Sequence, residues 1–551
     1  MLGVNRMALS VASPARARRA VAVPSSGRLA LGVRAEVLVV GALVALAGAV
    51  RWPNLLLSPQ FPSVGDTILA ALEMAEGRAF YLHDSAPYLG APFIWLLALV
   101  YRVFGPSLEV TLLVPWALGA LTVVPTYLLG RELAGRMAGL FAAALLATAG
   151  AHVVVTSHVV LSHSLTPLCS TFTLWLLARA VMRGSGRSLA LAGLGAGISL
   201  QTHPTVLPLL AGSAVAALLV RPAWLRTRWP YVALALVVVG YSTLLANHLL
   251  NGFEVVGDIE SKQETYLEGG AEAGEAADRG LYLTNLASLS VSLARMASGE
   301  INERESRTEY LADPWVLSYP VLAVLGALVA ARRGNPLLLV ALAVAVFWPP
   351  LLSGKYKPIL DGRYLMPDLP VIFVDIAIAV GALAGLLVRG APALRVAGGA
   401  AIVAGAVALT LHPLVQLERF YEDSQEDGFS NALYLRTMDQ VRSARRANEP
   451  VLLDPRLADV KSTGGGKASS SFAFLFALAR IPSEPLDTSV RPGGPAKAVE
   501  LAGRLAILHR STADRLDDTM RLEPLDGKRL TGKDSPNYRA YRIGTVSAGQ
   551  P

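Results

Sequence analysis

The sequence predicts a mainly α-helical, polytopic membrane protein that ends in a small α/β domain. Of its 551 residues, 53% are hydrophobic and only 16% are charged, and the mean hydropathy is +0.46. This composition is too apolar for an ordinary soluble enzyme. Many apolar runs of about 20 residues give the second observation. The third is a change to the composition of a soluble domain after His412.

The N-terminal segment 1–35 contains six arginines, and the first acidic residue is Glu36. We interpret this segment as a basic cytoplasmic tail. A secretory signal peptide is the alternative, because the apolar run from Val37 to Val50 is short and ends in small residues. Arg51 and Trp52 favour a first membrane span, since both are typical of the interfacial end of a helix.

The region 36–411 contains eleven apolar segments that we expect to cross the membrane. Arginines occupy every second loop and acidic residues the others, so the positive-inside rule puts the N-terminus in the cytoplasm and the C-terminus outside. QTHPT, residues 201–205, is either a tight outer turn or a kink within one long helix. The expected spans are 36–56, 109–130, 137–156, 164–182, 188–202, 204–220, 231–250, 315–331, 337–352, 364–388 and 396–411.

Residues 412–551 predict a soluble extracytoplasmic domain. PVLLDP, LAILHR and YRAYRIG are typical of short strands, and KAVELAGR and TADRLDDTM are typical of helices, which together indicate a small α/β module. STGGGKAS resembles a phosphate-binding loop, but Lys461 and Ala468 stand where that motif needs glycine and Ser or Thr. We therefore interpret this stretch as a loop.

Two features of the composition exclude other classes of function. The net charge of +8 comes from arginines in short loops between apolar runs, where they orient helices, so we predict no nucleic-acid partner. The single cysteine, Cys169, lies in an apolar stretch, so the chain cannot form an intrachain disulfide and lacks the common zinc-site spacings.

The first outer loop, residues 57–108, is where the sequence first suggests chemistry. DTILAALEMAEG predicts an interfacial helix with Asp66 in its first turn and Ile68, Leu69, Leu72 and Ala75 toward the membrane. PFIWLLALVYRVFG is too short to span and predicts a second helix that either lies in the interface or dips into the bilayer and returns. Asp66 would then lie at the level of the headgroups, as a catalytic carboxylate or merely as a helix cap.

Several motifs, taken in order, resemble the GT-C superfamily of membrane glycosyltransferases. They are Arg51 at the end of the first span, VGDT, YLGAPFIWLLALVYRVFG, YLLGREL and GRYLMPDLP. The closest group includes the protein O-mannosyltransferases and the aminoarabinose transferases that modify lipid A. The resemblance implies an enzyme that transfers a sugar from a polyprenyl-phosphate donor to a hydroxyl acceptor on the outer face, usually with inversion.

The resemblance also assigns roles to residues. Asp66 matches the first member of an acidic pair and would be the general base, whereas Thr67 stands where the second acid is common. Arg363 matches the arginine of GRYLMPDLP. His163 stands near the outer start of the fourth span, where the family often has an acidic or amide residue, and His203 follows a glycine-rich fifth span as a polar residue does in similar transferases.

The chemistry of the leaving group fits these roles. A lipid phosphate leaves as a stable anion, so it needs cations rather than an acid, and Lys355, Lys357 and Arg363 all precede an apolar span on the outer side. We expect Arg363 to be the main phosphate ligand, assisted by one lysine. The alternative is that these cations anchor helices to headgroups. His163 and His203 are either substrate ligands or histidines bonded within the protein.

The outer loop 251–314 predicts one more interfacial helix, with an apolar stripe of Leu286, Leu289, Leu293 and Met296. Its acidic residues Asp258 and Glu260 could bind a divalent cation with Asp66, but spacing gives no support, so we predict no metal and no cofactor. The expected partners are the lipid-linked donor, membrane lipids and an acceptor that is a glycan, a lipid or a protein.

Two other classes of function remain open at this stage. A transporter or flippase of lipid-linked glycans would show internal repeats and broken helices with charges near the bilayer midplane. A non-catalytic scaffold would use its outer domain to bind cell-wall material.

Overall fold

The computed structural model describes most of the chain in fifteen ranges. They are residues 32–57, 65–79, 82–83, 86–250, 279–301, 307–352, 362–387, 392–426, 431–454, 459–461, 467–469, 471–486, 501–517, 521–526 and 538–544. Outside these ranges lie Lys355, Lys357, Asp258, Glu260, the first half of KAVELAGR (497–500) and residues 1–31 of the N-terminal tail.

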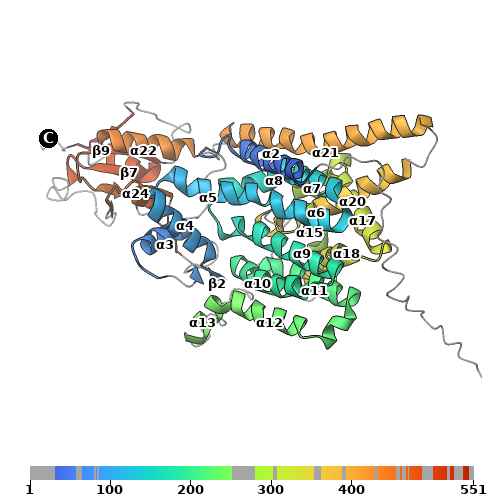
Figure 1. The fold of residues 1–551 in the computed structure, drawn as a ribbon. Coiled ribbons are helices and arrows are strands. Elements are labelled where there is room, and N and C mark those ends of the chain that lie inside the picture. Colours follow the sequence, from blue (N-terminus) through green and yellow to red (C-terminus); the bar gives the residue numbers. More distant parts are fainter. Residues whose placement is uncertain are drawn as a thin grey trace, which may run out of the picture.

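A bundle of helices forms the body of the molecule (Figure 1). Its helices are α2 (Val33–Arg51), α5 (Leu108–Leu121), α6 (Val123–Ala134), α7 (Arg136–Thr148), α8 (Gly150–Val153), α9 (Thr166–Arg183), α10 (Gly186–Thr202), α11 (Leu207–Val220), α12 (Trp229–Gly240), α13 (Ser242–Leu250), α15 (Arg279–Ser298), α16 (Arg307–Leu311), α17 (Pro314–Arg332), α18 (Leu337–Phe347), α19 (Pro349–Leu352), α20 (Leu369–Leu387) and α21 (Pro392–Glu426). The short turns between them are the π-helix η1 (Val154–His158) and the 3-10 helices η2 (Ser162–Ser164), η3 (Pro204–Val206), η4 (Pro222–Arg226) and η5 (Gly362–Leu365).

The bundle confirms a multi-pass membrane protein but not the number of spans. Within the described ranges, six helices are long and apolar enough to cross a membrane, or eight if each of two bent pairs is one span. The bends are 65° between α7 and α8–η1, and 61° between α12 and α13. The predicted count of eleven is not confirmed, because several expected spans are short helices, such as α11 with 14 residues and α18 with 11.

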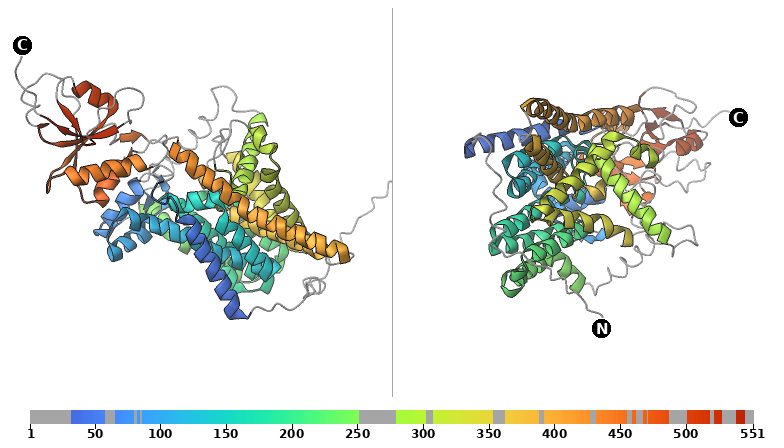
Figure 2. Two further views of the ribbon diagram at one scale, coloured as in Figure 1. Left: turned by 90° about the horizontal axis from the view of Figure 1, so that it is seen from above. Right: turned by 90° about the vertical axis from the view of Figure 1, so that its right-hand side faces the viewer.

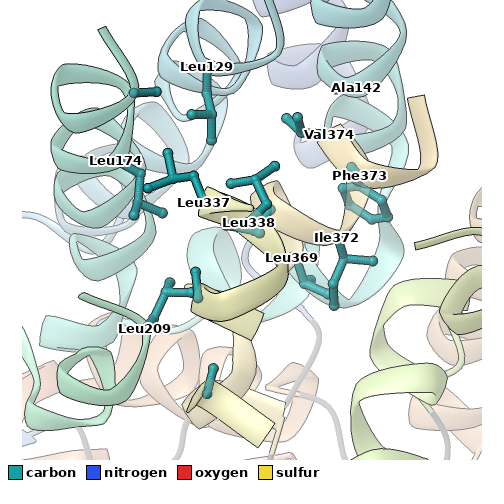
Figure 3. Packing of buried hydrophobic residues seen from close by; sticks show 14 of the residues in the cluster. Leu129, Ala142, Leu174, Leu209, Leu337, Leu338, Leu369, Ile372, Phe373 and Val374 are labelled. Atoms are coloured by element: carbon teal, nitrogen blue, oxygen red, sulfur yellow. The ribbon is translucent and has the colours of Figure 1, made fainter. Parts of the chain in front are cut away.

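The main core of the bundle is aliphatic. Leu129 on α6 and Leu174 on α9 lie near Leu337 and Leu338 of α18, and Phe373 on α20 belongs to the same cluster (Figure 3). All five side chains are at most 1% exposed. The hydropathy of the sequence predicts these helices, and dispersion contacts between such side chains hold them together.

The loops that carry arginines lie together at one end of the bundle. Glu36, at the start of α2, pairs with Arg131 at 2.6 Å and with Arg136 at 2.8 Å, and Arg183 pairs with Glu132 at 2.6 Å. The guanidinium of Arg221 donates to the carbonyl oxygen of Val181 at the end of α9 (2.7 Å). We call this the basic end.

The QTHPT segment is a tight turn rather than a kink. α10 stops at Thr202, His203 has an extended backbone (φ −168°, ψ 136°), and α11 follows η3. Both the start of α10 and the end of α11 lie at the basic end, where Gly186 packs against Trp229 and Arg221 binds α9. The two helices are therefore antiparallel.

The opposite end of the bundle carries the first loop and the C-terminal domain (Figures 1 and 2). The loop contains α3 (Gly65–Ala75), β1 (Leu82–His83), β2 (Ala86–Gly90) and α4 (Pro92–Phe104). The domain contains α22 (Ala432–Ala444), β3 (Val451–Leu453), β4 (Asp459–Lys461), β5 (Lys467–Ser469), α24 (Ser471–Leu478), β6 (Ser483–Pro485), β7 (Leu505–His509), α26 (Arg510–Asp517), β8 (Leu522–Pro524) and β9 (Tyr538–Ile543).

The C-terminal domain is built on a five-stranded sheet of order β6-β3-β7-β9-β8. β3 is parallel to β6 and β7, while β9 is antiparallel to β7 and β8. The three strands and the helix expected from PVLLDP, LAILHR, YRAYRIG and TADRLDDTM are therefore confirmed. The expected domain start at His412 falls inside α21, which continues to Glu426.

The first loop packs against the C-terminal domain through one apolar cluster, which we call the outer cluster. It includes Ile68 on α3, Phe93 on α4 and Phe472, Phe474 and Phe476 on α24. The expectation that Ile68 faces the membrane is wrong: it is fully buried, because α3 lies between α4 and the domain. α4 does present exposed apolar side chains, namely Leu99, Val103 and Phe104, as an interfacial helix would.

α15 also differs from the prediction. The helix forms, but every residue from Val291 to Glu300 is buried, and it packs on α17, α20 and η5. Its buried side includes Asn285, Ser288 and Ser292, so this helix belongs to the interior of the protein rather than to the membrane surface. The apolar stripe could not distinguish lipid from protein as its neighbour.

Candidate functional site

Four segments that are far apart in the sequence bring aromatic rings and a cation together at the end of the bundle that carries the first loop. The rings of His163 in η2 and His203 in the α10–η3 turn lie 4.0 Å apart between centroids. Tyr364 in η5 is 5.7 Å from His163 and 5.5 Å from His203. Tyr88 of β2 meets the His203 ring edge-on at 6.1 Å. We call these residues, with Arg363, the His–Tyr cluster.

Local backbone structure explains how the two histidines reach this place. His163 follows the π-helix η1, which interrupts the helical path after α8, and π-helices occur often at functional sites. His203 caps η3, whose first residue is Pro204. Its Nδ1 accepts a hydrogen bond from the backbone amide of Thr205 at 3.2 Å. Each histidine therefore lies where one helix ends and the next begins.

The charge state of His203 follows from its surroundings. Its side chain is 3% exposed, and the pKa of His203 is lowered to about 3, first by burial and then by the positive charge of Arg363. The neutral ring accepts at Nδ1 from an amide, so its proton lies on Nε2. His203 can therefore donate a hydrogen bond to an oxygen atom near Arg363.

Arg363 is half-buried beside Tyr364. Its guanidinium donates to the Tyr364 hydroxyl at 3.1 Å, and its Cζ lies 5.0 Å from the centre of the same ring. This contact orients a guanidinium, whose planar donors suit a phosphate group.

Asp66 lies in the first turn of α3, where the helix dipole favours a carboxylate. It is half-buried, and its neighbour Thr67 is 2% exposed. The ring contacts join His163, His203 and Arg363 of the predicted residues but do not include Asp66. Asp66 belongs to the same loop as Tyr88, and α3 packs on α4, which contacts η2.

Tyr88 and Tyr364 were not predicted as site residues. Tyr364 stands inside GRYLMPDLP, directly after Arg363, and Tyr88 directly precedes the LGAPFIW stretch of the first loop. Adjacency to these motifs is the signal that could have identified them. Gln201, the first residue of QTHPT, accepts a hydrogen bond from the Thr243 hydroxyl (2.5 Å), and the backbone of Gly90 lies directly against it.

Arg51 does not lie at the membrane interface, as its place in the sequence suggested. It is fully buried, and its Nη2 is 2.7 Å from Nδ1 of His152. Nη1 donates to the carbonyl oxygens of Ala47 and Ala147. The arginine thereby ties the end of α2 to the bend between α7 and α8, because a buried charge needs such partners.

A second buried contact ties the bundle to the helix that leads into the C-terminal domain. The hydroxyl of Tyr421 on α21 is 3.0 Å from Nε2 of His158, and the same ring nitrogen is 3.2 Å from the carbonyl oxygen of Pro53. Pro53 lies directly after the first span, and His158 ends the π-helix before η2. Tyr421 therefore meets both segments that lead to the site.

Two of the predicted phosphate ligands, Lys355 and Lys357, lie outside the described ranges, so their place in the site stays a prediction. Within the described ranges, no group of three or more His, Cys, Asp or Glu residues could hold a metal ion.

Comparisons with known proteins agree with this architecture. The structure of ArnT from Cupriavidus metallidurans bound to undecaprenyl phosphate matches with a TM-score of 0.55 and 12% identity, over 93% of this chain and 98% of that chain. ArnT in the apo state matches with a TM-score of 0.52 and 13% identity, over 94% and 99%. The oligosaccharyltransferase AglB from Archaeoglobus fulgidus is more distant, with a TM-score of 0.45 and 13% identity over 91% and 75%. No protein with a curated description matches the sequence.

The fold is thus similar to that of ArnT, and the predicted resemblance to the GT-C membrane glycosyltransferases is confirmed. Residues 90–246, less than a third of the chain, match the family model described as dolichyl-phosphate-mannose-protein mannosyltransferase.

Proposed function

We propose that the protein is a glycosyltransferase that moves a sugar from a polyprenyl-phosphate donor to a hydroxyl acceptor on the outer face of the membrane, with inversion. The single observation that carries this proposal is the His–Tyr cluster, in which Arg363 lies beside neutral His203 at the same end of the bundle as Asp66. The neighbour ArnT, with a similar fold, was crystallised with undecaprenyl phosphate.

In this proposal the cluster holds the phosphate of the donor. Arg363 supplies charge, Nε2–H of His203 supplies a hydrogen bond, and Lys355 or Lys357 assists. Tyr364 keeps the guanidinium in place. A diester phosphate at headgroup level is the ligand that such a set of donors suits.

Asp66 acts as the general base. It takes the proton of the acceptor hydroxyl while the hydroxyl oxygen bonds to the anomeric carbon. The bond from that carbon to the phosphate oxygen breaks, and its electron pair leaves with the phosphate. One carboxylate opposite the leaving group suffices for this single displacement. The C-terminal domain lies on α3, the helix that carries Asp66, and we propose that it helps to dock the acceptor.

The test uses the purified full-length protein in nanodiscs and a panel of radiolabelled polyprenyl-phosphate sugars, with an extract of envelope lipids and glycans as mixed acceptor. Wild type should consume at least one donor, and Asp66→Asn and Arg363→Ala should not. Glu76→Gln is the matched control, because Glu76 is an exposed acid just after the same helix. If wild type consumes no donor, or Asp66→Asn consumes it at the wild-type rate, the proposal fails.

A further inference from the structure

An apolar cavity of about 290 Å³ lies among α9, α10, α11 and α12, and its lining includes no residue of the His–Tyr cluster. The cavity exists because many of its lining residues have small side chains, for example Ala192 and Gly193 on α10 and Ala217 on α11. Thr173 and Trp224 are the lining residues whose side chains carry a polar atom, and the Thr173 hydroxyl already donates to the carbonyl oxygen of Cys169 at 2.8 Å. Water has too few partners in such a space, so a hydrocarbon is the suitable occupant.

The cavity opens toward the surface that faces lipid. Two of its lining residues, Ala214 on α11 and Leu234 on α12, are exposed. Beside them on the same helices, Val215 is 50% exposed, Leu219 is 65% exposed and Val238 is 49% exposed. In a bilayer these side chains meet acyl chains, so a lipid chain can enter the cavity from the side.

Three arginines lie where the cavity reaches the basic end of the bundle. Trp224 and Pro230 line it, and Arg226 and Arg228 lie between them in sequence, both exposed. Arg187 comes to the same place because the backbone of Gly186 lies directly on the indole of Trp229: a Cβ at Gly186 would be 2.2 Å from that ring.

None of these three arginines has an acidic partner among the residues that the structure describes. Arg228 lies over the ring of Trp229 at 5.0 Å. Two arginines nearby differ: Arg183 is paired with Glu132, and Arg221 binds the carbonyl oxygen of Val181. Three exposed positive charges therefore lie at the basic end of the bundle, next to an apolar cavity.

We propose that this is a binding site for one anionic phospholipid of the bilayer. An acyl chain fills the cavity, and the phosphate of the headgroup lies against Arg187, Arg226 and Arg228. Trp224 lies at the boundary between the two, as tryptophan commonly does at membrane interfaces. Basic pockets between spanning helices are suited to anionic headgroups, since each arginine near the surface adds to the attraction. The site is separate from the proposed transfer reaction and does not depend on it.

The test is lipid retention by the detergent-purified protein, measured by native mass spectrometry after addition of phosphatidylglycerol or phosphatidylcholine. Wild type should retain one phosphatidylglycerol in preference to phosphatidylcholine, and its apparent Tm should rise with the anionic lipid. The double variant Arg226→Gln/Arg228→Gln should lose at least about tenfold in affinity for phosphatidylglycerol. Ala214→Phe should lose retention of either lipid, because the new ring fills the opening.

Two controls separate the site from general effects. Arg332→Gln/Arg333→Gln removes a pair of arginines from another loop at the basic end, and Val215→Phe adds a ring beside the opening; both should bind as wild type does. The proposal is overturned if the two headgroups bind equally, if both test variants bind as wild type does, or if the retained molecule is a polyprenyl phosphate. An apparent Tm in lipid-free detergent close to that of wild type shows that each variant is folded.

Discussion

The imidazole rings of His163 and His203 lie in contact in a tilted arrangement, with their centroids 4.0 Å apart and their planes 37° from parallel. Two imidazolium ions at this distance would repel each other, so the contact requires that at least one ring is neutral. His203 is neutral, because burial and, second, the positive charge of Arg363 lower its pKa. The pair thus gives the site a hydrogen-bond donor that carries no charge.

This pair predicts sensitivity to acid. In the folded protein the pKa of His203 is about 3, below its usual value of 6.5, so the unfolded chain binds the additional proton between these values. Above about pH 6.5 the protonation of His203 therefore does not affect the free energy of unfolding. As the pH decreases from 6.5 toward 3, this free energy falls, because the unfolded chain takes up a proton that the folded protein does not bind. His203→Gln should have a smaller loss of apparent Tm between pH 7.5 and pH 5 than wild type. An equal loss of apparent Tm in both proteins would contradict the conclusion that His203 is neutral in the folded protein.

Tyr364→Phe should weaken donor binding more than it slows turnover. The substitution keeps the ring but removes the hydroxyl that accepts from Arg363, so the guanidinium loses one constraint. We expect KM for the donor to rise by roughly 5- to 10-fold, in line with one hydrogen bond of about 1 kcal/mol, while kcat changes little. Tyr231→Phe, an exposed tyrosine near the basic end, is the control and should leave both constants unchanged.

His152→Leu should destabilise the whole bundle. It removes a partner of the fully buried Arg51 and leaves that charge with two carbonyl oxygens. The expected loss is about 1.5 to 3 kcal/mol, the range for a hydrogen bond to a charged group. Thermal unfolding in detergent measures it as a lower apparent Tm, and an unchanged apparent Tm would mean that the contact is not needed.

Much of the fold could be predicted from the sequence. Helices followed from hydropathy, the common side of the basic loops followed from their alternation with acidic ones, and the strands of the C-terminal domain followed from short apolar runs. What could not be predicted is the neighbour of each apolar face. Ile68 and the second half of α15 were assigned to the membrane surface, but lipid and protein interior are equally apolar, so the pattern is the same for both.

The candidate site was predictable where a polar residue interrupts apolar surroundings. His203 stood out for this reason, whereas Arg363 and His163 stood out through the resemblance to the GT-C motifs, and the structure brings the three together. Tyr88 and Tyr364 did not stand out, because tyrosines near span ends are commonly anchors at the interface. Their role depends on contacts between distant segments, which one sequence does not reveal. The position of Arg51 was misread for the same reason.

The outer cluster makes a further prediction about the C-terminal domain. Phe474→Ala removes a fully buried ring from α24, which packs on α3, and should cost about 3 to 5 kcal/mol of local stability. Hydrogen exchange in α3 should become faster as a result. Leu508→Ala is the control, because Leu508 on β7 of the same domain is equally buried but belongs to a separate apolar cluster. Equal exchange of α3 in both variants would contradict a direct role of α24.

The contact between α3 and α24 joins Gly65–Ala75 to Ser471–Leu478, a segment that is made much later in synthesis. The side of α3 that α24 covers, which includes Ile68, therefore stays uncovered until α24 has been made and has docked. A chain that stops before α24 would leave this apolar surface exposed and would become a target for quality-control proteases.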